Sequence, residues 1–247
     1  MATEADLLEA FEEHSPREIE RILAAGVSPS EPIKRKRPVD CLIEGYLRSP
    51  RFGECLRVMA AAGADLGDPL LQALLLDDVL ALKALVAESS SVLVRRLSPL
   101  TAFTSCRNVT ALHICAEFNS IQCGKLLIEA GADVNAGSLV DSDGLGGQTP
   151  VFHTVNSIFN YCRPMMEMLI SAGASLDIKA PMLLWGDTMP WETIVFDVTP
   201  VSYAQCGLFR QFHRNERDVY DNIALLVRAR TGSAPPERNV PNKYLAN

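Results

Sequence analysis

The chain has 247 residues, of which 48% are hydrophobic and 6% aromatic, and its formal net charge at pH 7 is −7. A negative net charge gives no general reason to bind nucleic acid or an anionic membrane, because both require clustered positive charge. No apolar stretch approaches the roughly 18 residues of a transmembrane helix, and the N-terminus, MATEADLLEAFEE, is acidic and unlike a signal peptide. We therefore expect a soluble protein.

A helix-terminating motif recurs along the chain. It reads AAGVSP at 24–29, AGADL at 62–66, AGADV at 130–134 and AGASL at 172–176. Glycine suits this position because it adopts the left-handed conformation at a helix end at little cost. Such repetition predicts stacked units that share one core. The units are expected to start near Ala5, Arg37, Asp68, Thr110, Thr149 and Thr199.

The unit at 110–136, TALHICAEFNSIQCGKLLIEAGADVNA, shows the pattern most clearly. Thr110 can cap a first short helix with its hydroxyl, and the residues after it form a compact apolar face. A second apolar run, 123–130, ends at Gly131. Two helices of this size leave an apolar face uncovered, so neighbouring units must pack against it.

The period of about 33 residues and the motifs TALHICA, TPVFHTV and TPVSYAQ, with LLIEAGADVN after the first, resemble the ankyrin repeat family, whose signature includes T-P-L-H-x-A. The unit at 110–136 matches the signature at Thr110, Leu112, His113 and Ala116. Ala111 replaces the proline, His153 lies one place late in the next unit, and Asp68 replaces the threonine of the third. The resemblance covers about residues 5–230. It implies an all-α ankyrin-type solenoid of about six helix-turn-helix repeats with hairpin loops.

The two ends of the solenoid are expected to differ from its middle. The first unit is polar on its outer positions, as a terminal repeat must be. Residues 214–230 place apolar side chains at helical spacing opposite charged ones, which predicts a closing helix. Residues 231–247 are rich in proline and poor in apolar residues, so we expect the solenoid to occupy 1–230 and a disordered tail to follow.

The basic run KRKRP, Lys34 to Pro38, interrupts the acidic pattern between the first two units. Its composition suits a nuclear import signal or a patch for an anionic partner, and it equally suits a solvated loop. We expect a cytoplasmic protein, with the nucleus, through Lys34 to Arg37, as the alternative.

Seven cysteines are scattered along the chain. An odd number without regular spacing argues against a disulfide framework and for a reducing compartment. A zinc site could be sought in one group near the clearest unit: Cys106, His113, Cys115 and Cys123. No C-x-x-C pair occurs, and Cys115 belongs to the packed helix, so we expect buried free thiols and no metal or cofactor.

Few residues could support catalysis. The four histidines lie outside any hydrolase or metalloprotease motif, and the resemblance implies a structural role for His113, which hydrogen-bonds threonine and backbone groups. The segment DSDGLGGQ at 141–148 lacks the residues of a phosphate or calcium loop, so a hairpin tip is expected. We therefore expect no enzyme.

The resemblance implies that hairpin tips and the ends of the first helices face the concave, partner-binding side. By alignment, these helix ends include Glu44, Glu117, Phe118 and Asn156. A partner with basic and apolar surface would complement them. The alternative is that the glutamates form a solvated helix face.

The longest insertion lies between Gly173 and Thr199, and residues 176–198 are its core. Loops of this length in compact folds are usually functional or disordered, and this one is too apolar to stay solvated. It contains three candidate anchors: Leu184, Trp185 and Trp191. Either the insertion folds back as a hairpin that buries these groups, or a tryptophan stays exposed as an interface anchor. We favour Trp185, because the turn residues Gly186 and Asp187 follow it.

These patterns predict a non-catalytic scaffold or adaptor that binds a partner protein through its concave face and inserted loops. The function is carried over from the family and not from the fold alone. Two alternatives remain open: an enzyme or accessory subunit that uses the inserted loops as a site, and a structural subunit of a larger assembly.

Overall fold

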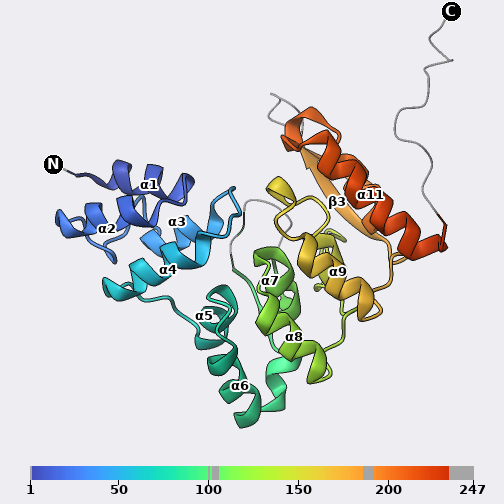
Figure 1. The fold of residues 1–247 in the computed structure, drawn as a ribbon, viewed down its shortest axis with the longest axis horizontal. Coiled ribbons are helices and arrows are strands. Elements are labelled where there is room, and N and C mark those ends of the chain that lie inside the picture. Colours follow the sequence, from blue (N-terminus) through green and yellow to red (C-terminus); the bar gives the residue numbers. More distant parts are fainter. Residues whose placement is uncertain (1, 100, 102–105, 186–191, 234–247) are drawn as a thin grey trace, which may run out of the picture.

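The structure is a computed structural model, and it describes residues 2–99, 101, 106–185 and 192–233. Most of its regular structure is helical, and the helices follow one another in pairs along the chain (Figure 1). The α-helices of the described residues are α1 (Glu4–Glu12), α2 (Pro16–Ala24), α3 (Pro38–Glu44), α4 (Phe52–Ala61), α5 (Pro69–Leu75), α6 (Val79–Glu88), α7 (Ala111–Phe118), α8 (Ile121–Glu129), α9 (Arg163–Ser171), α10 (Pro200–Cys206) and α11 (Glu216–Thr231). Short 3-10 helices are η1 (Ser90–Leu93), η2 (Pro150–His153), η3 (Ile158–Asn160) and η4 (Arg210–Phe212).

The recurring glycines end helices as the sequence predicts. Gly26, Gly63, Gly131 and Gly173 follow α2, α4, α8 and α9, and their φ angles lie between 91° and 100°. This left-handed conformation costs a side-chain-bearing residue energy and costs glycine little. The prediction of four equivalent helix ends is confirmed.

Side chains cap several of the helix starts. Thr110 and His113 cap α7 reciprocally, and Thr199 and Ser202 do the same for α10. Asp68, which stands where the signature has threonine, accepts hydrogen bonds from two backbone N–H groups of α5. A carboxylate at this position serves because it supplies the acceptor that the first-turn N–H groups lack.

Corresponding helices of successive pairs pack on one another. α1 lies against α3 and α2 against α4, and farther along the chain α5 lies against α7 and α6 against α8. In the fifth unit η2 takes the place of the first helix and packs on α7, while α9 packs on α8. One cluster of buried apolar side chains runs through these pairs. Within these groups, the stacking is of the kind that neighbouring helical repeats make.

The described residues are mostly helical, as the all-α expectation requires, but two antiparallel strand pairs occur between the helices. Strands β1 (Arg96–Leu97) and β2 (Val109–Thr110) form a small antiparallel sheet. The long insertion forms a second antiparallel pair, β3 (Ala180–Trp185) and β4 (Glu192–Val198). Helical repeats leave their connecting segments without partners, so a long apolar insertion satisfies its backbone groups by pairing with itself.

The segment that follows α3 contacts the last unit of the chain. The Tyr46 hydroxyl donates to the backbone carbonyl of Phe212 at 2.9 Å, and Arg214 donates to the Tyr46 oxygen at 2.8 Å. These bonds join the second unit to the last one, so they fix the relative position of segments about 170 residues apart in sequence.

The last unit closes with α11, near the expected 214–230. Val219 and Leu226 are buried, and Asn222 is buried between them with its amide donating to the Val155 carbonyl at 3.1 Å. The helix ends at Gly232, whose φ is 70°. Most of the predicted tail, 234–247, lies outside the described residues.

Candidate functional site

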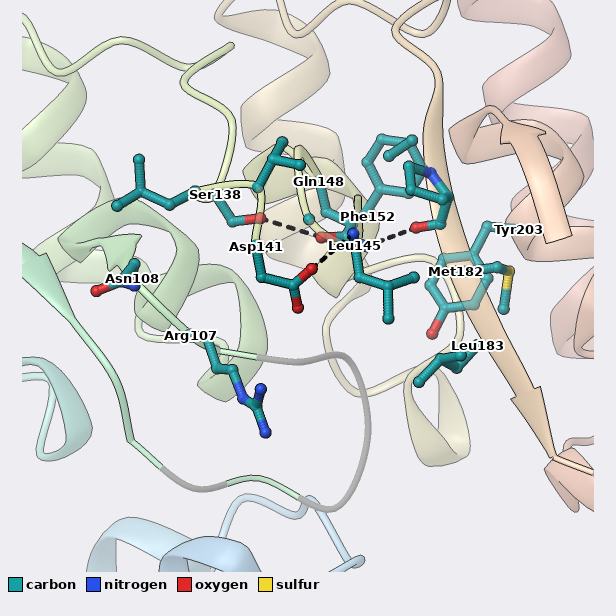
Figure 2. Close-up of a pocket in the computed structure, with 15 residues that line it drawn as sticks. Arg107, Asn108, Ser138, Asp141, Leu145, Gln148, Phe152, Met182, Leu183 and Tyr203 are labelled. Carbon is teal, nitrogen blue, oxygen red and sulfur yellow. Dashed lines mark hydrogen bonds between the residues drawn. The ribbon is translucent and has the colours of Figure 1, made fainter. Parts of the chain in front are cut away.

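A cavity of about 430 Å³ lies between the two inserted segments (Figure 2). One wall comes from the loop 137–148, and the other comes from residues 180–183 of β3. Phe152 and Tyr203 contribute aromatic rings to the lining, and their centroids are 6.3 Å apart. The cavity is therefore built by the parts of the chain that an ordinary helix pair would not need.

The 137–148 loop is a hairpin tip, as expected, held by hydrogen bonds within itself. The Asp141 carboxylate accepts from the backbone N–H groups of Asp143 and Leu145 at 3.0 and 2.9 Å. Gly146 has a φ of 131°, and a Cβ at this residue would lie 2.2 Å from the Leu139 carbonyl oxygen. The loop can close in this way because glycine occupies that position.

Gln148 connects this hairpin to β3 and to the repeat beneath. Its side-chain amide donates to the Pro181 carbonyl at 2.8 Å, and its side-chain oxygen accepts from the Ser138 hydroxyl at 3.0 Å. Its backbone carbonyl accepts from His113 Nε2 at 2.9 Å. Gln148 therefore holds this wall of the cavity both to β3 and to α7.

His113 has the structural role that the resemblance implies. Its Nδ1 accepts from the Thr110 hydroxyl at 2.8 Å, so the ring is neutral and donates through Nε2 to Gln148. Burial lowers its pKa to about 3, with the neighbouring His153 as a smaller cause. A charged ring would lose the Thr110 bond, because both of its nitrogens would then be donors.

The surface around the cavity is apolar on both hairpins. Leu139 and Val140 of the 137–148 hairpin are 52% and 61% exposed, and Phe196 of β4 is 73% exposed. Leu183 and Ile194 pair across the two strands and are both exposed. A second cavity, of about 290 Å³, shares Leu145, Ala180 and Pro181 with the first and is also lined by Ile194 and Phe196. We call these two adjoining cavities the groove.

The candidate anchors of the insertion have different positions. Leu184 is partly buried and packs against the core with Met182 and Val195. Trp185 is the last residue of β3, with Glu192 as its Cα partner. Trp191 lies outside the described residues, as does the side chain of Trp185.

The expected strip of exposed helix ends does not form. Glu117 is 4% exposed and its Oε1 accepts from Arg48 Nη2 at 3.3 Å. Phe118 is buried beneath the Arg48 guanidinium, whose carbon lies 4.5 Å from the ring centroid. The connection after α3 brings Arg48 across these helix ends and covers them.

The two other helix-end residues also have partners within the chain. Asn156 is buried, and its amide donates to the Tyr203 carbonyl. Glu44 is half-exposed and pairs with Lys36. Three of these four residues are buried and Glu44 is paired, so these four do not form an exposed strip.

A buried polar cluster that the sequence did not indicate lies at the same helix ends. His153 Nδ1 is 3.1 Å from Glu117 Oε2, and Cys106 Sγ is 3.9 Å from His153 Nδ1. We call Cys106, Glu117 and His153 the buried triad, and Arg48 is its partner. The signal in the sequence is the one-residue displacement of His153 from the signature position, which points its ring toward Glu117 rather than toward Thr149.

Pairs of short helices that end in glycine and stack on the next pair define a helical repeat protein. Residues 107–138, which include α7 and α8, match the family model of the ankyrin repeat. This match supports the resemblance to the ankyrin repeat family for this segment. Such repeats are generally protein–protein interaction modules and generally not catalytic.

A search of curated proteins found no match to the chain. In the described residues, no helix combines the length and the apolar composition needed to cross a membrane.

Proposed function

We propose that this chain is a non-catalytic interaction module, acting as a scaffold or adaptor, that binds an apolar segment of a partner protein in the groove. The observation that carries the proposal is the groove itself, about 430 and 290 Å³ in its two parts, with exposed apolar side chains on both of its hairpins. Single exposed apolar residues are ordinary on a protein surface, whereas a concavity that several of them border favours a binding site.

The hairpin geometry suits this role. Alternate residues of β3 face opposite sides, so Met182 and Leu184 pack on the core while Leu183 stays exposed. The core-facing residues hold the hairpin in place, and the outward ones are free for a partner. Burying one such apolar side chain completely is worth about 1.5–3 kcal/mol. Trp185, at the end of β3, remains our proposed additional anchor.

The decisive experiment compares two exposed apolar residues. Partners captured from a cell lysate by the wild-type chain are identified by mass spectrometry, and the affinity of the purified partner is then measured for two variants. Phe196→Asp should weaken binding at least tenfold, which is about 1.4 kcal/mol. Leu80→Asp, at a residue of α6 that is 77% exposed and far from the groove lining, should leave the affinity unchanged. Equal affinities for both variants would overturn the proposal.

We propose a cytoplasmic location for this module, with the nucleus as the alternative. Two of the four basic residues of Lys34 to Arg37 are paired with acids: Lys36 with Glu44, and Arg37 with Asp40. Such pairing leaves fewer free charges for an import receptor. Microscopy of the tagged chain with Lys34 and Arg35 changed to Ala tests the alternative, which predicts a loss of nuclear signal.

A further inference from the structure

We infer that the buried triad, Cys106, Glu117 and His153, is a binding site for a zinc ion. Their ligand atoms, one thiol sulfur, one imidazole nitrogen and one carboxylate oxygen, all lie within 4.8 Å of one another. The three side chains are buried and come from three segments: the residues before β2, the end of α7 and η2. Convergence of three different ligand types at one buried point is the observation on which the inference rests.

The distances agree with a tetrahedral ion. Zinc binds sulfur at about 2.3 Å and nitrogen or oxygen at about 2.0–2.2 Å, so tetrahedral ligand atoms lie about 3.3–3.6 Å apart. Here Nδ1 of His153 lies 3.1 Å from Glu117 Oε2 and 3.9 Å from Cys106 Sγ. Binding requires side-chain rotations that widen the first separation, shorten the second and bring Cys106 Sγ and the carboxylate oxygen, which are within 4.8 Å of each other, to the same range. A mixed sulfur, nitrogen and oxygen set suits zinc, a borderline-soft ion, better than magnesium or calcium.

The hydrogen bonds around the triad determine which of its atoms would face the ion. Arg48 bonds Oε1 of Glu117, so Oε2 is the oxygen that faces His153. An arginine on the outer oxygen of a ligating carboxylate orients it, as outer-shell partners of metal ligands do. In the ion-free chain His153 Nδ1 donates to Glu117 Oε2, so ion binding moves that ring proton to Nε2, which is buried without a partner among the described residues.

A small cavity lies beside two of the three ligands. A cavity of about 20 Å³ is lined by Glu117 and His153 together with Arg48 and Asn156. This volume holds about one water molecule, which needs roughly 10–15 Å³ of probe-occupied space. Three protein ligands and one water complete a tetrahedron around zinc.

Binding the ion requires a proton to leave. A thiol without a cation beside it is mostly protonated at neutral pH, because its ordinary pKa is about 8.5. A coordinated thiol is deprotonated by the charge of the ion. One zinc ion therefore replaces the thiol proton, which goes to solvent, and a sulfur–zinc bond forms.

The test uses the full chain without a histidine tag, stripped with a chelator, passed through a desalting column and then titrated with Zn²⁺ or Co²⁺. Elemental analysis should show one zinc per chain after gel filtration. Cobalt should give tetrahedral visible absorption and a thiolate-to-cobalt charge-transfer band. Cys106→Ser should lose that band and weaken zinc binding by about a hundredfold or more, since even loss of an outer-shell partner costs about 10–100-fold.

The matched control is Cys123→Ser, another buried thiol, whose Sγ donates to the Ala73 carbonyl and can be replaced there by a hydroxyl. This variant should keep the band and the affinity. A charge-transfer band that survives Cys106→Ser would overturn the inference. If Cys106→Ser does not fold, the wild-type chain still decides, because the absence of stoichiometric zinc or of a cobalt–thiolate band in it contradicts the site.

Discussion

The units that begin at Thr110 and Thr149 contain the same kind of side chain in different surroundings. His113 stands three residues after its threonine, bonds it through Nδ1, and reaches the Gln148 carbonyl through Nε2. His153 stands four residues after its threonine and lies against Glu117, with its ring 5.4 Å from that of His113. His113 therefore stabilises its own repeat, whereas His153, one residue later in its unit, belongs to a charged buried cluster.

The difference extends to the backbone. α7 is a complete α-helix, whereas the fifth unit begins with the short 3-10 helix η2. A 3-10 helix has three residues per turn, so its side chains are displaced relative to those of an α-helix. This displacement, together with the late histidine, directs His153 toward the helix ends, where Arg48 and Glu117 meet.

The largest expected effect comes from breaking the charged cluster. Glu117→Ala leaves Arg48 as a buried and unpaired charge, so it should lower the free energy of unfolding by about 3–5 kcal/mol. Urea denaturation in the presence of a chelator measures the loss. Glu167→Ala is the control: Glu167 pairs with Arg163 on the surface of α9, and its loss should cost under about 1 kcal/mol. Similar losses of stability in the two variants would contradict the claim that Glu117 compensates the buried charge of Arg48.

The next effect is the loss of stability in acid that two buried histidines, His113 and His14, should cause. Burial lowers the pKa of His113 to about 3, and burial with the nearby Arg48 lowers that of His14 to about 4. Unfolding restores the ordinary pKa of 6.5, so the unfolded chain binds protons that the folded chain excludes. Stability should be complete above about pH 7 and fall as the pH drops from 6.5 toward each folded value. By pH 5 each histidine should cost about 2 kcal/mol.

Denaturation at pH 7.5 and pH 5 measures this loss. His113→Asn should make the difference between the two pH values smaller by about 2 kcal/mol. His213→Asn, at an exposed histidine, should leave the difference as it is in the wild type. If His113→Asn keeps the full pH dependence, the neutral buried role assigned to His113 is wrong.

The smallest effect concerns a unit that has neither the threonine nor the histidine. Asp68 caps α5 by accepting from the N–H groups of Leu70 and Leu71. Asp68→Asn keeps an acceptor, whereas Asp68→Ala removes it and should cost about 1 kcal/mol. Thermal unfolding of both variants separates the cap from the charge. Equal midpoints for Asn and Ala would contradict the capping role.

Local rules predicted the repeating part of the molecule from sequence. Glycine in the left-handed region at Gly131 and Gly173, the Thr110 cap and the apolar spacing of α11 depend on residues within one or two turns. A hairpin in the insertion is one of the two alternatives that the sequence leaves open. Its residues alternate between the two faces: Met182 and Leu184 pack against the core, and Leu183 between them is exposed. Such patterns are visible in a single segment.

The candidate sites depend on contacts between distant segments. Glu117 counts as a helix-end residue in its own repeat, and its burial results from Arg48, which lies 69 residues earlier. The buried triad joins residues 47 positions apart, and the late position of His153 in its unit is the local sign of it that the sequence offers. The groove likewise needs two insertions side by side, and sequence alone does not place one against the other.

Hydrogen exchange with and without the captured partner tests the central claim most directly, which is that the groove binds that partner. We predict that bound partner slows amide exchange in residues 137–148 and 180–198 and leaves α1 to α4 unchanged. Protection confined to α1 to α4, with no change in the two hairpins, would contradict the account.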